Sequence, residues 1–189
     1  APAGAATAWS PAALPPRRAK RSPFFVYVSE GYWEAVGTHR SDLRAQADVL
    51  TRHVDVDIDG FEVAPGIWIG EGAEVDPDAV LKGPIAIGDY AKVEAGAELR
   101  EFTVLGNNVV VKGGAFLDRA VIHDNVFIGA QVALRGCGIG KHTDVIRAGP
   151  IDEGAVVADC RVRGDGAGRP RCPGGAAPST DTTATQLNN

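Results

Sequence analysis

Four histidines are the side chains of this 189-residue chain that are best suited to acid–base or metal chemistry near neutral pH. His39 and His53 flank a predicted helix. His123 and His142 lie in a repeated region, one predicted coil apart on the same face, where they could supply a general base or half of a metal site. They occupy different positions within their repeats and need not converge. The alternative is that both are solvated side chains without a chemical role.

Carboxylates and thiols offer two further groups of candidates. The stretch VDVDIDGFE (54–62) could bind a cation, but its alternation also predicts a strand with Val54, Val56 and Ile58 facing inward and the aspartates facing solvent. Cys137 and Cys160 are expected to be buried structural thiols in or beside the wall of the repeated region. We therefore expect no metal site in this chain.

Composition and motifs exclude several functions. The net charge of −5 argues against a nucleic-acid partner. No apolar stretch approaches the length of a membrane-spanning helix, and the N-terminus lacks the apolar core of a signal peptide. The odd number of cysteines fits a reducing compartment, so a cytoplasmic location is expected. The chain has neither a Gly-x-Ser-x-Gly motif nor a P-loop, so its motifs predict no nucleotide pocket.

The elements that must position these side chains are set by an internal repeat. An aliphatic residue recurs every six residues from Ile69, with two steps of five, and these positions carry only Ile, Leu or Val. The fifth position of the hexads is mostly small or β-branched, and glycine is frequent at the second, where a turn can require positive φ. The sixteen aliphatic positions are Ile69, Val75, Leu81, Ile87, Val93, Leu99, Leu105, Val111, Leu117, Ile122, Ile128, Leu134, Ile139, Val145, Ile151 and Val157.

This spacing predicts an all-β fold, a left-handed parallel β-helix. Three hexads form the three walls of an 18-residue coil, and the aliphatic residues stack inside from coil to coil. Sixteen hexads predict about five coils. The fold alone does not identify an activity, because many unrelated functions use it. A pure spacer or an oligomerisation prism is the alternative to an enzyme.

Four zones are expected along the chain. Residues 1–22 form a basic, Ala/Pro-rich tail that is predicted to be disordered. Residues 23–60 form a small α/β segment with a strand at 24–28, an extended segment at 31–38 and a helix at 39–53, for which Ser41 is the predicted N-cap. Residues 61–163 form the β-helix, and residues 164–189 form a second disordered tail. Two strands and one helix bury little surface, so the second zone is expected to need a partner domain.

The motif GYWEAVGTH (31–39), followed by a helix, DIDGFE and hexapeptide repeats, resembles the C-terminal part of sugar-phosphate nucleotidyltransferases. Residues 55–129 look most like actinobacterial mannose-1-phosphate guanylyltransferases, and the similarity covers about residues 24–160. The resemblance implies transfer of a nucleotidyl group to a sugar 1-phosphate, in the biosynthesis of GDP-mannose and related nucleotide sugars. In the intact family, an N-terminal Rossmann-like domain binds the triphosphate and Mg²⁺ assists the reaction.

Two departures from the family put activity in doubt. This chain has no room for the triphosphate-binding domain and lacks its Gly-x-Gly-Thr-Arg-Leu motif. In the family, a Trp-x-Asp-x-Gly-Thr pattern supplies a magnesium ligand, but here Ala35 stands at the aspartate position, and a methyl group cannot coordinate Mg²⁺. The remnant of that motif is Gly31, Tyr32, Trp33, Gly37 and Thr38. We expect no cofactor in this chain.

Two functional hypotheses follow. In the first, the chain is a truncated nucleotidyltransferase-like protein, inactive alone, that retains the β-helix as an assembly and regulatory module. In the second, it is a free-standing hexapeptide-repeat acyltransferase, for which His123 and His142 are the catalytic candidates, or a non-catalytic oligomerisation subunit. Whether the chain is an enzyme stays open between them. A third option is a regulatory paralogue that forms a complex with a full-length nucleotidyltransferase. Self-association into a homo-oligomer is expected under all three, and none of them involves a nucleic acid or a membrane.

Overall fold

The computed structural model describes residues 30–147, 151–156, 161–164 and 170–171, in two compact units, residues 1–35 and 36–189. Residues 30–35 of the first unit form neither helix nor strand. The predicted tail at 1–22, the strand at 24–28, Val157, Cys160, Cys172 and most of the tail after residue 164 lie outside the described residues. No helix in the described part of the chain is long and apolar enough to cross a membrane.

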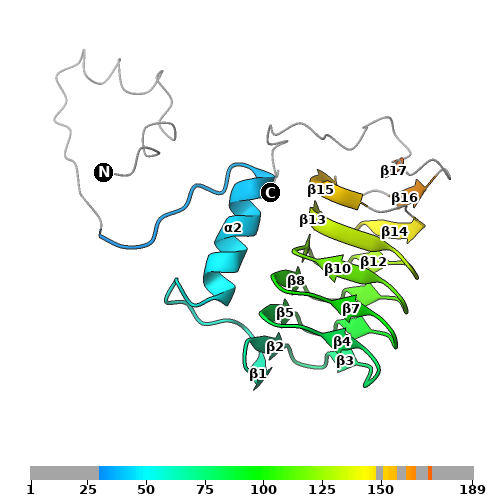
Figure 1. Cartoon of the computed structure of the whole chain (residues 1–189), viewed down its shortest axis with the longest axis horizontal. Coiled ribbons are helices and arrows are strands. Elements are labelled where there is room, and N and C mark those ends of the chain that lie inside the picture. The colour runs from blue at the N-terminus through cyan, green and yellow to red at the C-terminus, as the bar shows by residue number, and fades with distance from the viewer. Residues whose placement is uncertain (1–29, 148–150, 157–160, 165–169, 172–189) are drawn as a thin grey trace, which may run out of the picture. The chain divides into compact units, whose positions relative to one another are not determined.

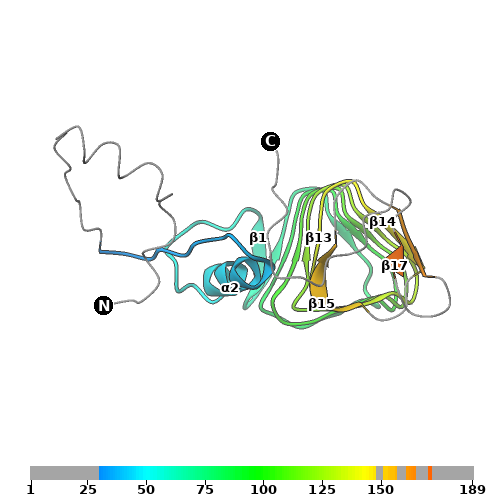
Figure 2. The ribbon, with the colours of Figure 1, turned by 90° about the horizontal axis from the view of Figure 1, so that it is seen from above.

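The second unit contains a left-handed parallel β-helix with three faces, as the repeat predicts (Figures 1 and 2). Two faces join in one sheet because the long strand β13 continues round a corner from one to the other. The first face consists of β2 (Ile67–Ile69), β5 (Ile85–Ile87), β8 (Thr103–Leu105), β11 (Val121–Ile122), the end of β13 (Ala133–Ile139) and β15 (Ile151–Val156). The second consists of β3 (Glu74–Val75), β6 (Lys92–Val93), β9 (Val110–Val111), β12 (Phe127–Ile128), β14 (Asp144–Arg147) and β16 (Arg161–Gly164). The third consists of β4 (Val80–Leu81), β7 (Glu98–Leu99), β10 (Phe116–Asp118) and the starts of β13 and β15, since β15 pairs with β13 round the same corner.

Two short strands pair in antiparallel fashion at the ends of these sheets. β1 (Phe61–Ala64) pairs with β2 at the beginning of the β-helix, and β17 (Pro170–Arg171) pairs with β16 at the other end. Every other strand pairing among the described residues is parallel. The continuously described chain contains about four turns of the β-helix.

The register of the coils confirms the predicted repeat. Ile85 pairs with Ile67 and with Thr103, so the first coils are 18 residues long, whereas Val121 pairs with Val104 and with Gly138, so later coils are 17 residues long. The predicted inward positions from Ile87 to Ile151 are all buried. They form a single core of stacked aliphatic side chains that contributes most of the hydrophobic stabilisation.

The two five-residue steps change which side chain faces inward. The sequence pattern placed Val121 at the small inward position, but Ala120 occupies it and is fully buried, while Val121 lies on the outer side of the wall. One residue is missing from that corner, so the inward position moves one residue earlier. Cys137 takes the same position in the next coil and is fully buried, as predicted.

The three corners require left-handed backbone conformations. These do not occur at the second-position glycines, where the sequence analysis expected them. Positive φ recurs at the fourth position of the hexad, for example at Gly72, Tyr90, Asn108, Asn125 and His142. The expectation that second-position glycines supply positive φ is therefore wrong. Asparagine is among the residues that tolerate this conformation best, which suits its use at two of these corners.

Close approach between coils explains the second-position glycines instead. A Cβ built on Gly88 would lie 2.6 Å from the Asn107 side-chain oxygen and 2.6 Å from the backbone of Gly106. That oxygen accepts a hydrogen bond from the backbone N–H of Asp89 at 2.8 Å, and the Asp89 side chain accepts one from Glu71 at 2.7 Å. Glycine leaves room for this ladder of side-chain acceptors along one corner.

Helix α2 (His39–Leu50) precedes the β-helix and is shorter than predicted at its C-terminal end. Its N-cap is Thr38, not Ser41 as the sequence suggested. Ser41 is the third helical residue of a capping box, in which its backbone N–H donates to the Thr38 hydroxyl at 3.2 Å. The Ser41 hydroxyl in turn accepts from the Thr38 N–H at 3.0 Å, so the cap depends on both side chains.

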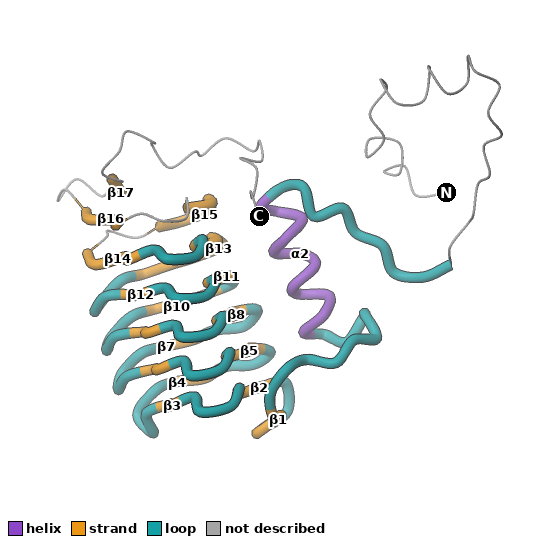
Figure 3. The backbone as a smooth tube through the Cα atoms, turned by 180° about the vertical axis from the view of Figure 1, so that it is seen from behind, coloured by secondary structure: helices purple, strands orange, loops and turns teal. Residues whose placement is uncertain are grey.

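The first face of the β-helix is the partner that α2 was expected to lack. The helix lies along this face in all views (Figure 3). The His39 Nε2 atom lies 3.0 Å from the Gly136 carbonyl oxygen, and just beyond the other end the Arg52 guanidinium lies 5.5 Å from the centre of the Trp68 ring. The outward positions of this face carry no charge, and they are Trp68, Ala86, Val104, Val121 and Gly138.

His39→Ala is expected to loosen the start of α2 and to reduce the free energy of unfolding by about 1 kcal/mol, because one partly buried hydrogen bond to Gly136 is lost. Hydrogen exchange of the α2 amides and urea unfolding would measure the two effects. His53→Ala is the matched control, because the exposed His53 contacts only the nearby Thr51 hydroxyl, at 2.7 Å. Equal effects of the two substitutions would contradict a specific role for His39.

The aspartate-rich segment after the helix does not form the predicted strand. Residues 54–60 contain no strand, and pairing begins only at Phe61. Val56 is 51% exposed, so the predicted alternation of buried valines and solvated aspartates is wrong at that position. No neighbouring strand borders residues 54–60 among the described residues, and an isolated extended segment gains no ladder hydrogen bonds.

Candidate functional site

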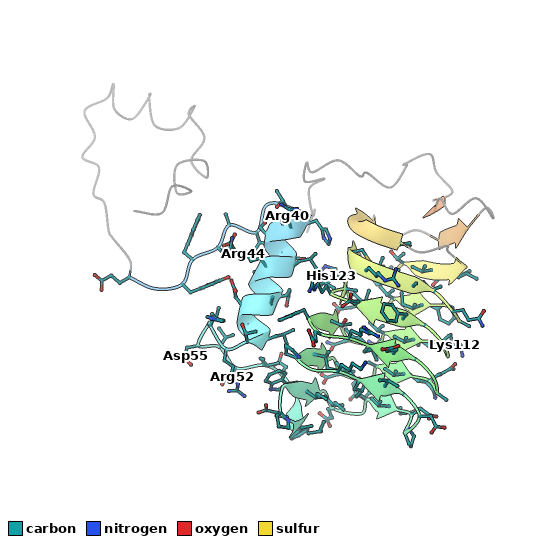
Figure 4. All side chains as sticks on the ribbon, viewed as in Figure 1. Arg40, Arg44, Arg52, Asp55, Lys112 and His123 are labelled. Carbon is teal, nitrogen blue, oxygen red and sulfur yellow. The ribbon has the colours of Figure 1, made fainter. Side chains whose placement is uncertain are left out.

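The candidate site is the corner at which β11 ends, where His123 interrupts a column of glycines. The equivalent positions in the preceding coils are Gly70, Gly88 and Gly106. The backbone N–H of His123 donates to the Ile139 carbonyl at 2.9 Å, which continues the parallel ladder. The imidazole is half-buried, and no hydrogen bond to it is formed within the described residues. Figure 4 shows His123 on the side of the β-helix nearest α2.

Asp124 follows His123 in the chain, and both oxygens of its carboxylate have partners in neighbouring coils. Its Oδ1 atom accepts a hydrogen bond from the Asn107 backbone N–H at 3.0 Å, and its Oδ2 atom lies 3.1 Å from the Lys141 ammonium. These two contacts continue the ladder of side-chain acceptors and add a cation from the next coil. The carboxylate is therefore held by one residue of the preceding coil and one of the following coil.

The charges around Asp124 lower the pKa of its carboxyl group. The largest cause is the hydrogen bond from the Asn107 N–H, followed by the hydrogen bond from Lys141. The charges of Lys141 and His123 lower the pKa further, while partial burial opposes the shift. The pKa of Asp124 lies below its ordinary value, so the carboxyl group is ionised at neutral pH.

Asp124→Asn is expected to remove a contribution to stability that depends on pH. The carboxyl pKa is lowered in the folded state, so the contribution is present above the ordinary aspartate pKa and is lost as the pH falls through the lowered value. The carboxylate is partly solvated, so the loss at pH 7 is about 0.5 kcal/mol and disappears in acid. Melting temperatures measured from pH 7 to pH 3 would show the wild type and the variant converging. A constant difference would contradict this origin, and the exposed Glu101→Gln is the control.

The other candidate side chains do not join this site in the described structure. His142 is exposed at a left-handed corner of the next coil, and its backbone N–H donates to the Asp124 carbonyl at 3.2 Å. His39 binds Gly136, and His53 lies beyond the helix. Cys137 is inside the core, where it is inaccessible to a substrate.

The residues of the family motif have structural or exposed positions. Thr38 caps α2, and the Gly37 N–H donates to the Ser41 hydroxyl at 3.2 Å. Tyr32 and Trp33 are 46% and 61% exposed, and a Cβ built on Gly31 would meet no atom within 4 Å. With Ala35 at the aspartate position, these residues do not fit the magnesium ion that the family uses.

No group of three potential metal-ligating side chains is arranged to hold an ion in the described parts of the chain. This holds for the aspartates of residues 54–62 as well. Sequence reasoning identified His123 but missed Asp124 and Lys141. The signal for Asp124 was its place in a column with Asp89 and Asn107, one coil apart, directly after the glycine column.

Comparisons with known proteins are sparse. No family model matches the chain, and no curated protein matches it. Among solved structures, the acetyltransferase domain of PglB from Neisseria gonorrhoeae is 17% identical, with a TM-score of 0.39, and the match covers 72% of this chain and 68% of that one. The structure of PerB from Caulobacter crescentus in complex with CoA and GDP-perosamine is 17% identical, with a TM-score of 0.30, covering 69% and 65%.

Both scores are too low to carry an argument about this chain. Neither of the two structures is described as a nucleotidyltransferase, so the resemblance to mannose-1-phosphate guanylyltransferases receives no support from them. The architecture rests on the chain's own register and burial, which show a hexapeptide-repeat left-handed β-helix with a helix packed along one face.

Proposed function

We propose that this chain is an acyltransferase of the hexapeptide-repeat class and that His123 is its general base. The observation that carries the proposal is an imidazole at a corner otherwise lined by glycine, followed in the chain by a carboxylate that Asn107 and Lys141 hold. A base of this kind needs access to substrate and a neighbouring group that stabilises its protonated form. His123 is half-buried, and the Asp124 carboxylate that follows it in the chain is the proposed neighbouring group.

The proposed reaction transfers an acyl group from a thioester to a hydroxyl or amine. His123 takes the proton from the attacking oxygen or nitrogen, which bonds to the thioester carbonyl carbon. The carbon–sulfur bond then breaks, and the leaving thiolate receives the proton from the imidazolium. The Asp124 carboxylate supports the imidazolium during this sequence but touches neither reactant.

The proposal predicts that His123→Ala lowers kcat/KM for acyl transfer by about 100-fold or more. Thiol release from acetyl-coenzyme A, measured with a panel of amino sugars and sugar nucleotides as acceptors, is the assay. His142→Ala is the matched control and should change the rate by less than about twofold, since His142 lacks the fixed carboxylate. Wild-type protein that acylates no acceptor, or equal loss in both variants, would contradict the assignment.

A second proposal keeps the resemblance to sugar-phosphate nucleotidyltransferases. The observation that favours it is the order of a GYW-x-x-VGT segment, a helix fixed to the prism face and the β-helix itself. In this case the chain serves as an assembly and regulatory module without nucleotidyl transfer of its own. Pure protein should then release no pyrophosphate from GTP and mannose 1-phosphate, but should co-elute with a full-length guanylyltransferase in size-exclusion chromatography. Release of pyrophosphate by the pure chain would refute this second proposal.

A further inference from the structure

The beginning of the β-helix is an open end of the hydrophobic core. Six inward side chains of the first coil are only partly buried, whereas the residues that stack on them one coil later are at most 1% exposed. The six are Ile67, Ile69, Ala73, Val75, Ala79 and Leu81. In the described part of the chain, only β1 lies beyond this coil, and it covers the edge of one face alone.

The backbone at this end presents acceptors. In the second coil, the carbonyl groups of Ala91 and Val93 accept hydrogen bonds from the first coil at 2.8 and 2.9 Å, and those of Ala97 and Leu99 do the same. The corresponding carbonyl groups of Val75 and Leu81 point away from the second coil by the same register. No described strand lies on that side of β3 or β4. Unpaired strand edges of this kind are sites at which another strand can add.

The rim of the open end is strongly acidic. Residues 54–79 contain eight acidic residues and no lysine, arginine or histidine, although the whole chain has a net charge of only −5. Glu62 pairs with Arg52, and Glu74 pairs with Lys92. The remaining six form no ion pair within the described residues, and they are Asp55, Asp57, Asp59, Glu71, Asp76 and Asp78.

Exposed apolar side chains adjoin this rim. Phe61 and Val63, two residues apart on β1, are 71% and 58% exposed, and Val80 on β4 is 44% exposed. The open end therefore combines apolar surface, free carbonyl groups and negative charge. A second copy of the same end would bring the two acidic rims together, and this like-charge contact disfavours a symmetric end-to-end dimer.

We propose that the open end of the β-helix, formed by β1, β3, β4 and the acidic rim, docks a basic peptide segment of a partner protein as an added strand. The backbone N–H groups of that segment would donate to the free carbonyl groups of the first coil. Its lysine or arginine side chains would pair with the rim, and its alternate apolar side chains would cover Val75 and Leu81. This proposal is independent of the chemistry assigned to His123.

The test uses the full chain and a short peptide that alternates lysine and valine, with a peptide alternating glutamate and valine as the control. We expect saturable binding of the lysine peptide alone. Raising the salt from about 0.05 to about 0.3 M should weaken it by about tenfold or more. Hydrogen exchange should slow on binding in residues 73–81, rather than across the whole β-helix.

Two charge-matched variants separate docking at this end from general attraction to an acidic protein. Asp59→Asn/Glu71→Gln/Asp78→Asn should weaken binding by about tenfold, whereas Glu30→Gln/Glu34→Gln/Glu101→Gln should leave it within about twofold. Equal affinities for the two variants, protection away from residues 73–81 or no binding at all would overturn the proposal. A dimer that is lost in Phe61→Ser/Val63→Thr would overturn it too, because a second copy would then be the occupant.

Discussion

Leu117→Ala is expected to lower the free energy of unfolding by about 2–5 kcal/mol. Leu117 is fully buried in the middle of the β-helix, and it pairs in register with Leu99 in the coil before and with Leu134 in the coil after. Both neighbours are themselves fully buried and held by ladder hydrogen bonds. The walls cannot collapse into the cavity. The variant therefore loses the transfer free energy of the removed atoms and also the packing contacts of the side chains that line the cavity.

Leu81→Ala provides a control in the same column. Leu81 pairs with Leu99 but has no coil on its other side in the described structure, and it is only partly buried. Its truncation should therefore cost about 1 kcal/mol, well below the cost at Leu117. Urea unfolding followed by circular dichroism would measure both values. Equal losses would mean that the first coil is covered as fully as the middle of the β-helix.

Gly129→Ala is expected to be the most disruptive small substitution, costing about 3 kcal/mol. A Cβ at this position would lie 2.2 Å from the Ile146 carbonyl oxygen and 2.9 Å from its carbonyl carbon. Both atoms belong to the backbone of the next coil, so no side-chain rotation can relieve the clash. The two coils would have to separate, which breaks the hydrogen bond from the Gly129 N–H to the Val145 carbonyl at 2.7 Å.

Gly96→Ala distinguishes this effect from the ordinary cost of replacing glycine. Gly96 has φ of +72°, but a Cβ there would meet only the Gly114 nitrogen at 3.8 Å. The expected cost is about 1–2 kcal/mol, from the left-handed conformation alone. Melting temperatures of the two variants should therefore differ. A Gly129→Ala protein as stable as Gly96→Ala would contradict the close approach of the coils.

The sequence predicted the β-helix because one physical requirement recurs at a fixed interval. Each inward residue must be aliphatic to stack on the equivalent residue of the next coil. The result is a six-residue repeat of aliphatic residues that no alternative fold explains as well. The shortened coils were placed less accurately, since deletion of one corner residue moves the inward position from Val121 to Ala120, and both residues are apolar. Hydrophobicity alone cannot distinguish these two neighbours.

The packing of α2 could not be predicted from the helix itself. The face that α2 packs against is marked by a column of uncharged outward residues that contains Trp68 and Val121. These residues can be recognised as one column only when the register of the coils is known. The predicted burial of Val56 was wrong for a similar reason, because it depended on a long-range partner. Alternation of apolar and polar residues predicts a strand only where a neighbouring strand is available. At the candidate site, the sequence indicated His123 but not the Asp124 carboxylate, which long-range contacts hold in place.

The helix along the first face sets a limit on how this protein can change length over evolution. Twelve helical residues span about 18 Å, which is close to the height of four stacked coils at about 4.8 Å each. One end of the segment is tied to Gly136 and the other to Trp68. Insertion or loss of a coil between those two points would require a matching change of about three residues in the helix. Coils added beyond Gly136 face no such requirement. The length of α2 therefore limits the number of coils between Trp68 and Gly136, but not the number of coils after Gly136.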